Sequence, residues 1–437
     1  MRISVIGCGY LGAVHAASMA ELGHDVVGID VDAGKVQALA AGRAPFFEPG
    51  LEEILDSAMR SGRLRFSTST ADAKGAQVHF IAVGTPQARG GGAADLTYVH
   101  AAVDGLLPHL SPGDLIAGKS TVPVGTAARL AERVEAAGTG AMLAWNPEFL
   151  REGYAVKDTI SPDRLVYGLP SGDAAPAARR LLDEVYATAV GNGTPVVAAD
   201  YATAELVKVS ANAFLATKIS FINAMAEIAE VTGADVTQLA DAIGYDPRIG
   251  RRFLNAGIGF GGGCLPKDIR AFVARAEELG RGESVDFLKQ VDAINLRRRQ
   301  RMVDLVVESL GDQVYKKKVT VLGLAFKPDS DDVRDSPALD VAVQLNGLGA
   351  HVIATDPAAI PNSIRLHPQL GFATDTLDAL HEADAVVLVT EWKEYRTLDP
   401  VEVGRLVRDK LIIDGRNVLD PERWRAAGWT YRGMGRP

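Results

Sequence analysis

Short runs rich in Val and Ile alternate with stretches of helical periodicity, once at the start of the chain and again near its end. Strands that alternate with helices predict a parallel sheet with helices on both faces. The expected strands are 3–7, 25–30, 77–84, 114–120 and 141–147 in the first sheet and 319–325, 351–356, 385–390 and 411–415 in the second. We therefore expect an α/β protein with two doubly wound, Rossmann-like domains.

The two halves repeat the same features in the same order. A glycine follows the first strand at Gly7 and at Gly323, and the second strand ends in an acid at Asp30 and at Asp356. This correspondence predicts that one nucleotide-binding architecture occurs twice. Bulky residues at 324–327 replace the later glycines of the first half, so we expect the second sheet to hold a single nucleotide rather than a dinucleotide.

A long helix is expected between the two halves, because there is no Gly or Pro from Asp200 up to Gly233. Apolar residues with helical spacing form a seam along it, namely Val207, Ala211, Phe214, Phe221, Met225 and Ile228. A small domain would not cover so long a helix, so we expect it to join the sheets and to offer this face to another subunit. The alternative is a helix that is buried within one chain.

Composition narrows the class of protein. The 437 residues are 47% hydrophobic, enough for several cores, and the net charge of -9 comes with scattered Lys and Arg. We therefore expect no electrostatic binding to nucleic acid or to an anionic membrane. Only Cys8 and Cys264 are present, which indicates no disulfide framework and favours a reducing compartment. With no apolar signal core and no apolar stretch of about 18 residues, we expect a cytoplasmic protein.

The segment GCGYLG at 7–12 lies between an expected strand and an expected helix. Its glycines allow backbone amides to approach a pyrophosphate at the helix N-terminus. Asp30 ends the second strand, 18 residues after Gly12, where its carboxylate can bind ribose hydroxyls and would repel a 2′-phosphate. This context favours NAD over NADP and over a glycine-rich structural turn. Cys8, within the turn, is interpreted as a small packed side chain.

Polar residues follow the next strands, where ligands of such sheets gather. Thr85, Ser120 and Thr121 are therefore expected to reach the cofactor or the reacting oxygen, although each could be a helix cap. Glu148 and Glu152 would share a face if a helical turn follows Pro147, one as a positioned acid and one as a ribose or water contact. A solvated pair of glutamates is the alternative.

Cys264 stands in the segment FGGGCLPKD, after three glycines and before Pro266. Proline suits the first turn of a helix, so the thiol should lie at a helix N-terminus, where the dipole and Lys267 favour a nucleophilic thiolate. Asp268 should lie on the same face, to orient water or move a proton. A buried inert cysteine is the alternative, and we take the bare glycines as the argument against it.

Lys208 and Asn212 are four residues apart on the long helix. A lysine and an amide on a mostly apolar helix could stabilise a developing oxyanion. They could equally form a surface pair.

These motifs occur in one order with three others, DPRIG, GLAFKPDSDDVRDSP and IIDGRNVLD. In this the chain resembles the UDP-glucose and GDP-mannose dehydrogenase family over nearly its whole length. The cysteine segment and the later FKPD segment make the resemblance far more specific than a Rossmann fingerprint. It implies an NAD-binding domain at 1–195, a central helical dimerisation domain at 196–300 and a C-terminal UDP-sugar-binding α/β domain at 301–437.

The activity that this resemblance implies is oxidation of the C6 alcohol of a nucleotide sugar to a carboxylate, with two NAD and one water. UDP-glucose is the expected substrate, with GDP-mannose or UDP-N-acetylmannosamine as the alternative. Cys264 would hold the aldehyde as a thiohemiacetal and then as a thioester, and Lys208 and Asn212 would stabilise the oxyanion. Asp268, Glu148 and Thr121 would handle the proton and the water, and the resemblance does not identify the base. It implies a homodimer or a larger homo-oligomer, and no metal.

The same resemblance assigns the binding residues. Those expected to hold NAD are Gly7, Gly9, Tyr10, Leu11, Gly12, Asp30, Lys35, Thr85, Pro86, Thr121, Glu152, Lys267 and Arg334. Those expected to hold the nucleotide sugar are Glu148, Phe149, Leu150, Arg151, Glu152, Lys208, Asn212, Arg248, Phe253, Leu254, Asn255, Gly257, Gly261, Cys264, Lys327 and Arg416. A second subunit is expected to contribute Arg248.

Two departures and two rival functions are to be weighed. Gly263 stands where many members of the family have Ser, and Leu265 stands where many that act on UDP-glucose have Phe, which weakens the choice of sugar.

A two-electron hydroxyacid or hydroxyacyl dehydrogenase also joins a Rossmann domain to a helical dimer, but it needs neither Cys264 nor a second sheet. A non-enzymatic sensor of NAD and nucleotide sugars would not need the cysteine, lysine and aspartate together.

Overall fold

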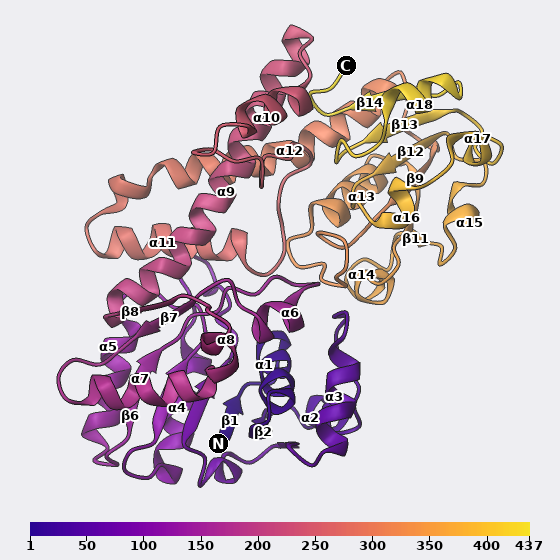
Figure 1. The fold of residues 1–437 in the computed structure, drawn as a ribbon. Helices are drawn as coiled ribbons and strands as arrows, with labels where there is room; N and C mark the ends of the chain where they lie inside the picture. Colours follow the sequence, from indigo (N-terminus) through magenta and orange to yellow (C-terminus); the bar gives the residue numbers. More distant parts are fainter. The chain divides into compact units, whose positions relative to one another are not determined.

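The computed structural model describes residues 1–437, which form two compact units (Figure 1). The first unit comprises 1–211 and 270–282, and the second comprises 212–269 and 283–437. Two helices pass from one unit into the other, α9 (Tyr201–Thr232) and α11 (Leu265–Glu278). The fold class expected from the sequence is confirmed, whereas the three domain boundaries stay a prediction.

An eight-stranded sheet forms the centre of the first unit, in the order β3-β2-β1-β4-β5-β6-β7-β8. Neighbouring strands are parallel except β6 and β7. The strands are β1 (Arg2–Ile6), β2 (Asp25–Ile29), β3 (Leu64–Ser67), β4 (Val78–Ile81), β5 (Leu115–Gly118), β6 (Met142–Trp145), β7 (Leu165–Gly168) and β8 (Val196–Ala199). The five strands expected from the sequence are β1, β2, β4, β5 and β6.

Both faces of this sheet are buried. Along β1, Ile3 and Val5 belong to one core and Ile6 belongs to a second core on the opposite face, as expected for a sheet with helices on both sides. The helices are α1 (Tyr10–Glu21), α2 (Ala33–Ala40), α3 (Leu51–Arg60), α4 (Thr97–Leu106), α5 (Thr126–Ala136), α6 (Ala155–Ile160), α7 (Ala174–Val185) and α8 (Ala187–Gly191), with single 3-10 turns at Thr70–Ala73 and Leu107–His109.

The second unit has its own six-stranded parallel sheet, in the order β11-β10-β9-β12-β13-β14. Its strands are β9 (Lys318–Leu322), β10 (His351–Thr355), β11 (Gly371–Phe372), β12 (Ala385–Leu388), β13 (Leu411–Asp414) and β14 (Thr430–Gly433). Counted within each unit, the first six strands have the same spatial order, 3-2-1-4-5-6. The correspondence between the two halves is therefore confirmed at the level of topology.

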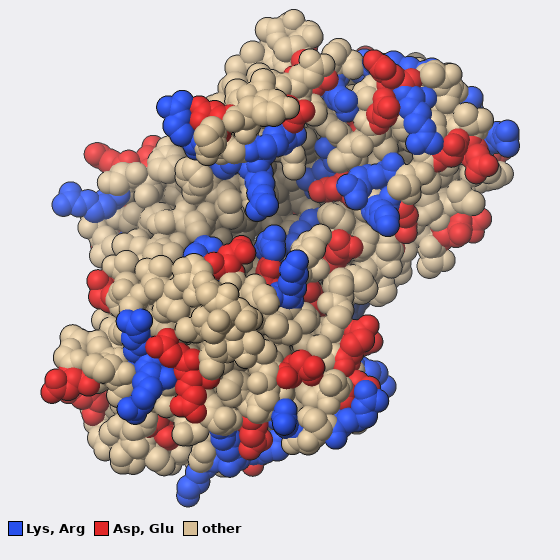
Figure 2. All heavy atoms as spheres, in the orientation of Figure 1, with Lys and Arg blue, Asp and Glu red and all other residues tan.

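Helices of the second unit are α10 (Val236–Gly244), α12 (Phe287–Ser309), α13 (Pro337–Gly347), α14 (Ile360–Leu366), α15 (Thr376–Leu380), α16 (Lys393–Arg396), α17 (Pro400–Val403) and α18 (Pro421–Ala426). A 3-10 turn at Gly282–Val285 precedes α12. None of the helices combines the length and the apolar character that crossing a membrane requires. Basic and acidic side chains are interspersed on the face drawn in Figure 2.

The long helix α9 is confirmed at almost the expected bounds, and Gly233 with φ 76° follows its last residue. Its buried stripe consists of other residues than the expected seam, among them Val209, Ala213, Ile222 and Ala226. The seam residues Phe214, Phe221 and Ile228 are 67%, 49% and 54% exposed. The interpretation of a helix that is covered entirely within one chain is therefore wrong for this face.

Candidate functional site

The turn between β1 and α1 leaves room for a ligand on one side and none on the other. A Cβ at Gly12 would lie 1.7 Å from the carbonyl oxygen of Gly7, and one at Gly7 would lie 2.7 Å from Val83. At Gly9 a Cβ would meet nothing within 4 Å, and no side chain caps the helix there. The open side and the uncapped amides fit a pyrophosphate at the N-terminus of α1.

Asp30 fits the ribose end of the same ligand. Its carboxylate accepts hydrogen bonds from the backbone N–H of Cys8 (2.8 Å) and of Asp32 (3.0 Å) and from Lys35 (2.9 Å). Burial alone would raise the pKa of Asp30, but these donors outweigh it and hold the pKa below its ordinary value. The acid is therefore an anion fixed beside the glycine turn. The Cys8 side chain is fully buried, as expected of a packing residue, and burial raises the pKa of its thiol.

Glu48 is a residue of this site that sequence reasoning missed. It is 6% exposed and accepts hydrogen bonds from the backbone N–H groups of Gly153 (2.6 Å) and Ala155 (2.7 Å) and from the Tyr10 hydroxyl. It thereby ties the first turn of α1 to the segment that follows β6. No sequence pattern marks Glu48, because its backbone partners Gly153 and Ala155 lie about a hundred residues away.

The loop after β5 is held on three sides. The Thr85 hydroxyl donates to the carbonyl oxygen of Thr121 (2.9 Å), and Arg275 donates to that of Val124 (3.0 Å). Glu205, from the start of α9, accepts the N–H groups of Gly125 and Ala127 at 2.7 Å each. The expected residues Thr85 and Thr121 are thus brought together, and Glu205 is a further contributor that the sequence did not indicate.

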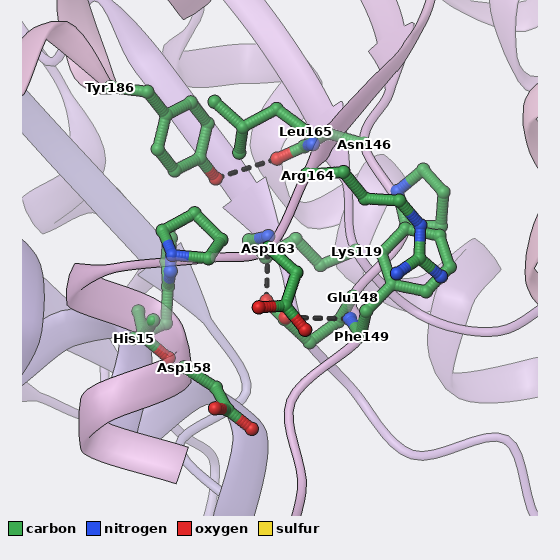
Figure 3. Close-up of a pocket in the computed structure, with 13 residues that line it drawn as sticks. His15, Lys119, Asn146, Glu148, Phe149, Asp158, Asp163, Arg164, Leu165 and Tyr186 are labelled. Carbon is green, nitrogen blue, oxygen red and sulfur yellow. Dashed lines mark hydrogen bonds and ion pairs between the residues drawn. The ribbon is translucent and has the colours of Figure 1, made fainter. Parts of the chain in front are cut away.

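Glu148 and Lys119 form a buried ion pair (Figure 3), with 2.9 Å between Nζ and Oε2 and side chains 15% and 3% exposed. Burial alone would raise the pKa of Glu148, but the Lys119 ammonium and the backbone N–H of Phe149 hold it below its ordinary value. Lys208 contributes in the same direction. Glu148 is therefore a carboxylate at neutral pH, which suits a group that orders water.

A small cavity of about 30 Å³ lies against this pair. Figure 3 shows Tyr186 and Asn146 joined by a hydrogen bond at one side of it, 2.6 Å long. His15 also lines the cavity and is fully buried, and neither of its ring nitrogens has a protein partner. A cavity of this size with polar walls can hold water.

No helical turn follows Pro147. The expectation that Glu148 and Glu152 share one face depended on such a turn, so its basis is absent. Glu148 instead turns its carboxylate back onto the N–H groups of Phe149 (2.7 Å) and Leu150 (3.0 Å), which keeps this segment irregular. The ring of Phe149 lies 3.9 Å from the Arg164 guanidinium carbon and 5.4 Å from Lys208 Nζ.

Three other residues that were expected at the site, Arg151, Pro86 and Leu11, also belong to the first unit. The guanidinium of Arg151 pairs with Asp158 at 2.6 Å. Pro86 is exposed, and Leu11 is half-buried on α1.

In the second unit, Cys264 immediately precedes α11, and its side chain is exposed. The expected position at a helix N-terminus is confirmed. One turn into the helix, Asp268 is 2% exposed and accepts hydrogen bonds from Asn212 (2.7 Å) and Lys267 (2.5 Å). The structure thus pairs Asn212 with Asp268 and gives Lys267 a carboxylate partner, so both residues orient the acid one turn after Cys264.

Two of the three glycines before Cys264 have a different reason from the one we inferred. A Cβ at Gly261 would lie 2.2 Å from the carbonyl oxygen of Asp335, one at Gly262 would lie 2.8 Å from the Phe326 ring, and one at Gly263 would lie 2.4 Å from the Arg334 guanidinium. Close packing against the Asp335 backbone and the Phe326 ring, and not bareness around the thiol, therefore requires glycine at 261 and 262, whereas at Gly263 the flexible Arg334 side chain can move aside. This close approach of the two segments also explains why the motifs FGGGCLPKD and GLAFKPDSDDVRDSP occur together.

The loop before Cys264 contains most of the other expected sugar contacts. A Cβ at Gly257 would lie 2.5 Å from the carbonyl oxygen of Gly415, Leu254 is buried, and Phe253 has φ 66°. Asn255 accepts a hydrogen bond from Arg251 at 2.7 Å. Arg248 precedes this loop in the chain; its side chain is 88% exposed and pairs only with Asp246.

Arg416 and Lys327 border this loop. The Arg416 guanidinium donates to the carbonyl oxygens of Val389 (2.8 Å), Gly259 (2.9 Å) and Phe326 (3.1 Å). It therefore holds the loop in place through its backbone. Lys327 Nζ lies 5.5 Å from the Phe326 ring, and Arg334 pairs with Asp332 at 2.7 Å.

Asp356, the counterpart of Asp30, serves the protein's own backbone. It accepts N–H groups from Leu324 (2.7 Å) and Ala325 (3.0 Å), and the indole N–H of Trp392 at 3.1 Å. Two further backbone N–H groups bind its other oxygen. With these contacts made, the carboxylate has no place for ribose hydroxyls, in agreement with the expectation that this sheet binds no dinucleotide.

Comparison with protein families gives three matches along the chain. The UDP-glucose/GDP-mannose dehydrogenase family matches with its NAD binding domain at residues 1–190, its central domain at 202–297 and its UDP binding domain at 320–421. Together these matches cover most of the chain.

Individual proteins are similar over the full length. The UDP-glucose 6-dehydrogenase of Rhizobium meliloti is 42% identical, and the alignment covers 100% of both chains. The UDP-glucose 6-dehydrogenase TuaD of Bacillus subtilis is also 42% identical, with 100% of this chain and 93% of TuaD covered. A UDP-glucose dehydrogenase structure from Pyrobaculum islandicum matches with a TM-score of 0.90 at 40% identity, covering 100% of this chain and 98% of that one. A UDP-D-ManNAc dehydrogenase structure from Pyrococcus horikoshii has a TM-score of 0.85 at 28% identity, with 100% and 99% covered.

Proposed function

Because the chain belongs to the UDP-glucose/GDP-mannose dehydrogenase family, we propose that it oxidises the C6 hydroxyl of UDP-glucose to a carboxylate, with NAD as the oxidant. The observation that carries this proposal is the exposed Cys264 thiol at the start of α11, followed one turn later by the buried Asp268. A two-electron dehydrogenase needs no such thiol. The relatives that are 42% identical over the whole chain support UDP-glucose as the sugar nucleotide.

NAD would be held by the turn at Gly7, Gly9 and Gly12 and by Asp30, and when bound it accepts a hydride in each of two oxidations. The Cys264 thiolate adds to the C6 aldehyde and forms a thiohemiacetal, whose oxidation leaves a thioester. Water then releases the uronate and restores the thiol. Because this cycle needs a reduced Cys264, we place the protein in the cytoplasm.

Five polar groups can share the proton transfers and the stabilisation of charge. Asp268, oriented by Asn212 and Lys267, follows Cys264 by one helical turn and would take the proton of the thiol. Glu148, kept ionised by Lys119, can order the hydrolytic water together with Thr121. Lys208 and Asn212 supply a cation and an amide donor for the oxyanion at C6.

The nucleotide sugar would occupy the residues grouped around the Cys264 loop. Arg416 fixes this loop through the carbonyl oxygen of Gly259, so its contribution to substrate binding would be indirect in part. Asp356 is occupied by backbone donors, so the second sheet would receive the uridine diphosphate alone. Arg248, exposed and directed away from its own unit's core, would complete the site of a second copy.

The test is a panel of UDP-glucose, GDP-mannose and UDP-N-acetylmannosamine, with the NADH formed per sugar counted by absorbance. We expect two NADH per UDP-glucose and the highest kcat/KM for that sugar. One NADH per sugar would point to the two-electron hydroxyacid or hydroxyacyl class instead. Absence of NAD reduction with every sugar would favour the non-enzymatic sensor.

We further propose that the exposed stripe of α9 pairs two copies of this chain. Phe214, Phe221 and Ile228 recur at intervals of seven, which puts them on one face of the helix. Exposed apolar residues in such a row usually mark an interface. Phe221→Glu should place a charge in a closed apolar contact and shift the protein from dimer to monomer in sedimentation velocity.

The matched control for this substitution is Tyr98→Glu, since Tyr98 is 57% exposed on the helix α4. It should leave the mass unchanged. A Phe221→Glu protein that sediments as the wild type does would rule out this face as the interface.

A further inference from the structure

The second unit contains a cavity of about 360 Å³ that no step of the proposed reaction uses. It lies between the end of α9, the helix α12 and the last residues of the chain, and all its walls belong to this one unit. Its volume is within the range of small-molecule sites, about 300–1,000 Å³. The cavity therefore has room for a ligand.

Four arginines line this cavity, from separate elements. Arg301 comes from α12, Arg425 from α18, Arg432 from β14 and Arg436 from the residues after it. Only one acidic side chain, Glu230, lines the same wall. In a chain with a net charge of -9, this is a local excess of positive charge.

The acidic groups nearby do not balance these arginines. Glu230 is shared by Arg301 (2.7 Å) and the buried Arg298 (3.5 Å), and Arg301 also reaches Glu308 (2.7 Å). Burial lowers the pKa of Arg298 below its usual range, because the charge of Glu230 does not fully replace its lost hydration. Glu230, the one acidic side chain that lines the cavity, is thus already engaged by two arginines.

The other arginines are still less compensated. Arg436 meets Asp235 at 3.3 Å. Arg425 donates to an oxygen of Pro437, a residue that also lines the cavity, at 2.6 Å and lies 5.5 Å from the Tyr431 ring, and Arg432 forms no ion pair. The Arg432 guanidinium at the cavity is therefore available to an anion without the loss of an existing contact.

We propose that this cavity is a binding site for a small multivalent phosphate anion, separate from the site of the dehydrogenase reaction. Guanidinium groups bind oxyanions through paired N–H donors. The arginines reach the cavity from several directions, and a phosphate or pyrophosphate offers oxygens in several directions, whereas a carboxylate offers its two oxygens in a single plane. The chemistry of the walls thus favours phosphate.

Calorimetry with inorganic pyrophosphate tests the site, on protein saturated with NADH and UDP so that the proposed nucleotide sites are filled. The wild type should bind one pyrophosphate per chain, more weakly as salt is added. Arg432→Ala should weaken binding about tenfold, and Arg425→Ala with Arg432→Ala about a hundredfold, since each charge-assisted contact contributes about a factor of ten or more. Arg432 is exposed and unpaired, so its loss leaves the fold intact.

The matched control replaces Arg133 and Arg179, two half-exposed arginines of the first unit that pair with Asp104 and Asp183. It should bind pyrophosphate as the wild type does. The proposal is overturned if the wild type binds none, if Arg432→Ala binds equally tightly, or if the control loses as much. Displacement of pyrophosphate by an equal concentration of citrate would overturn the assignment to phosphate.

Discussion

Cys264→Ser should lower the steady-state rate of uronate formation by about 10³-fold or more. A serine hydroxyl at the start of α11 stays protonated at neutral pH, so it adds poorly to an aldehyde, and an ester is a poorer acyl donor than a thioester. The side chain is exposed, so the substitution should leave the fold unchanged. The rate is measured as NADH formed with UDP-glucose and saturating NAD.

Binding measurements separate a chemical role from a structural one. Calorimetry should show that Cys264→Ser binds UDP-glucose and NADH about as tightly as the wild type, because the Asn212–Asp268 contact and the glycine turn are untouched. A variant that still forms uronate within tenfold of the normal rate would remove Cys264 from the nucleophile's role. Loss of binding equal to the loss of rate would mean that the thiol positions the loop.

The architecture was largely predictable because it follows from local patterns. Alternating Val and Ile runs located nine strands, and the Gly-free and Pro-free stretch located α9. The missed strands are short, and several lie at or next to a sheet edge: β3, β8 and β11 have half-exposed faces, so hydrophobic periodicity marks them weakly.

The site was predictable as a set of motifs but not as a set of contacts. The sequence indicated Cys264 and Asp30 because their neighbours have local meanings, a helix start and a glycine turn. It misread the reason for the glycines at 261 and 262, which is the approach of residues 326–335 from elsewhere in the chain. Glu48 and Glu205 were invisible for the same cause, since each bonds backbone donors far away in the sequence.

Lys119→Met should cost the first unit about 3–5 kcal/mol of unfolding free energy at neutral pH. The methionine fills a similar volume between the Phe80 and Tyr186 rings but leaves the Glu148 carboxylate buried without its cation. The loss is measured by urea denaturation followed through the fluorescence of Trp145, a buried residue of β6. The exposed pair of Arg133 with Asp104 provides the control, because Arg133→Met should cost no more than about 1 kcal/mol.

The pH dependence of that loss identifies its cause. In the wild type the pKa of Glu148 lies below its ordinary value, so the ion pair stabilises the protein above the unfolded pKa, and this contribution disappears as pH falls through the folded one. In Lys119→Met burial is opposed only by the backbone N–H of Phe149 and by Lys208, so the pKa of Glu148 should rise and the variant should lose stability as pH rises. The difference between the two proteins should therefore shrink from pH 7 towards acid.

Removing the Glu148 carboxylate as well separates the effect of the buried charge from the effect of packing. Lys119→Met combined with Glu148→Gln has no buried charge, so it should regain a large part of the lost unfolding free energy, and its remaining deficit should be nearly independent of pH. If the double variant is as unstable as Lys119→Met, packing around Phe80 and Tyr186 rather than the uncompensated charge accounts for the loss. The role of Lys119 in keeping Glu148 ionised would then have to be given up.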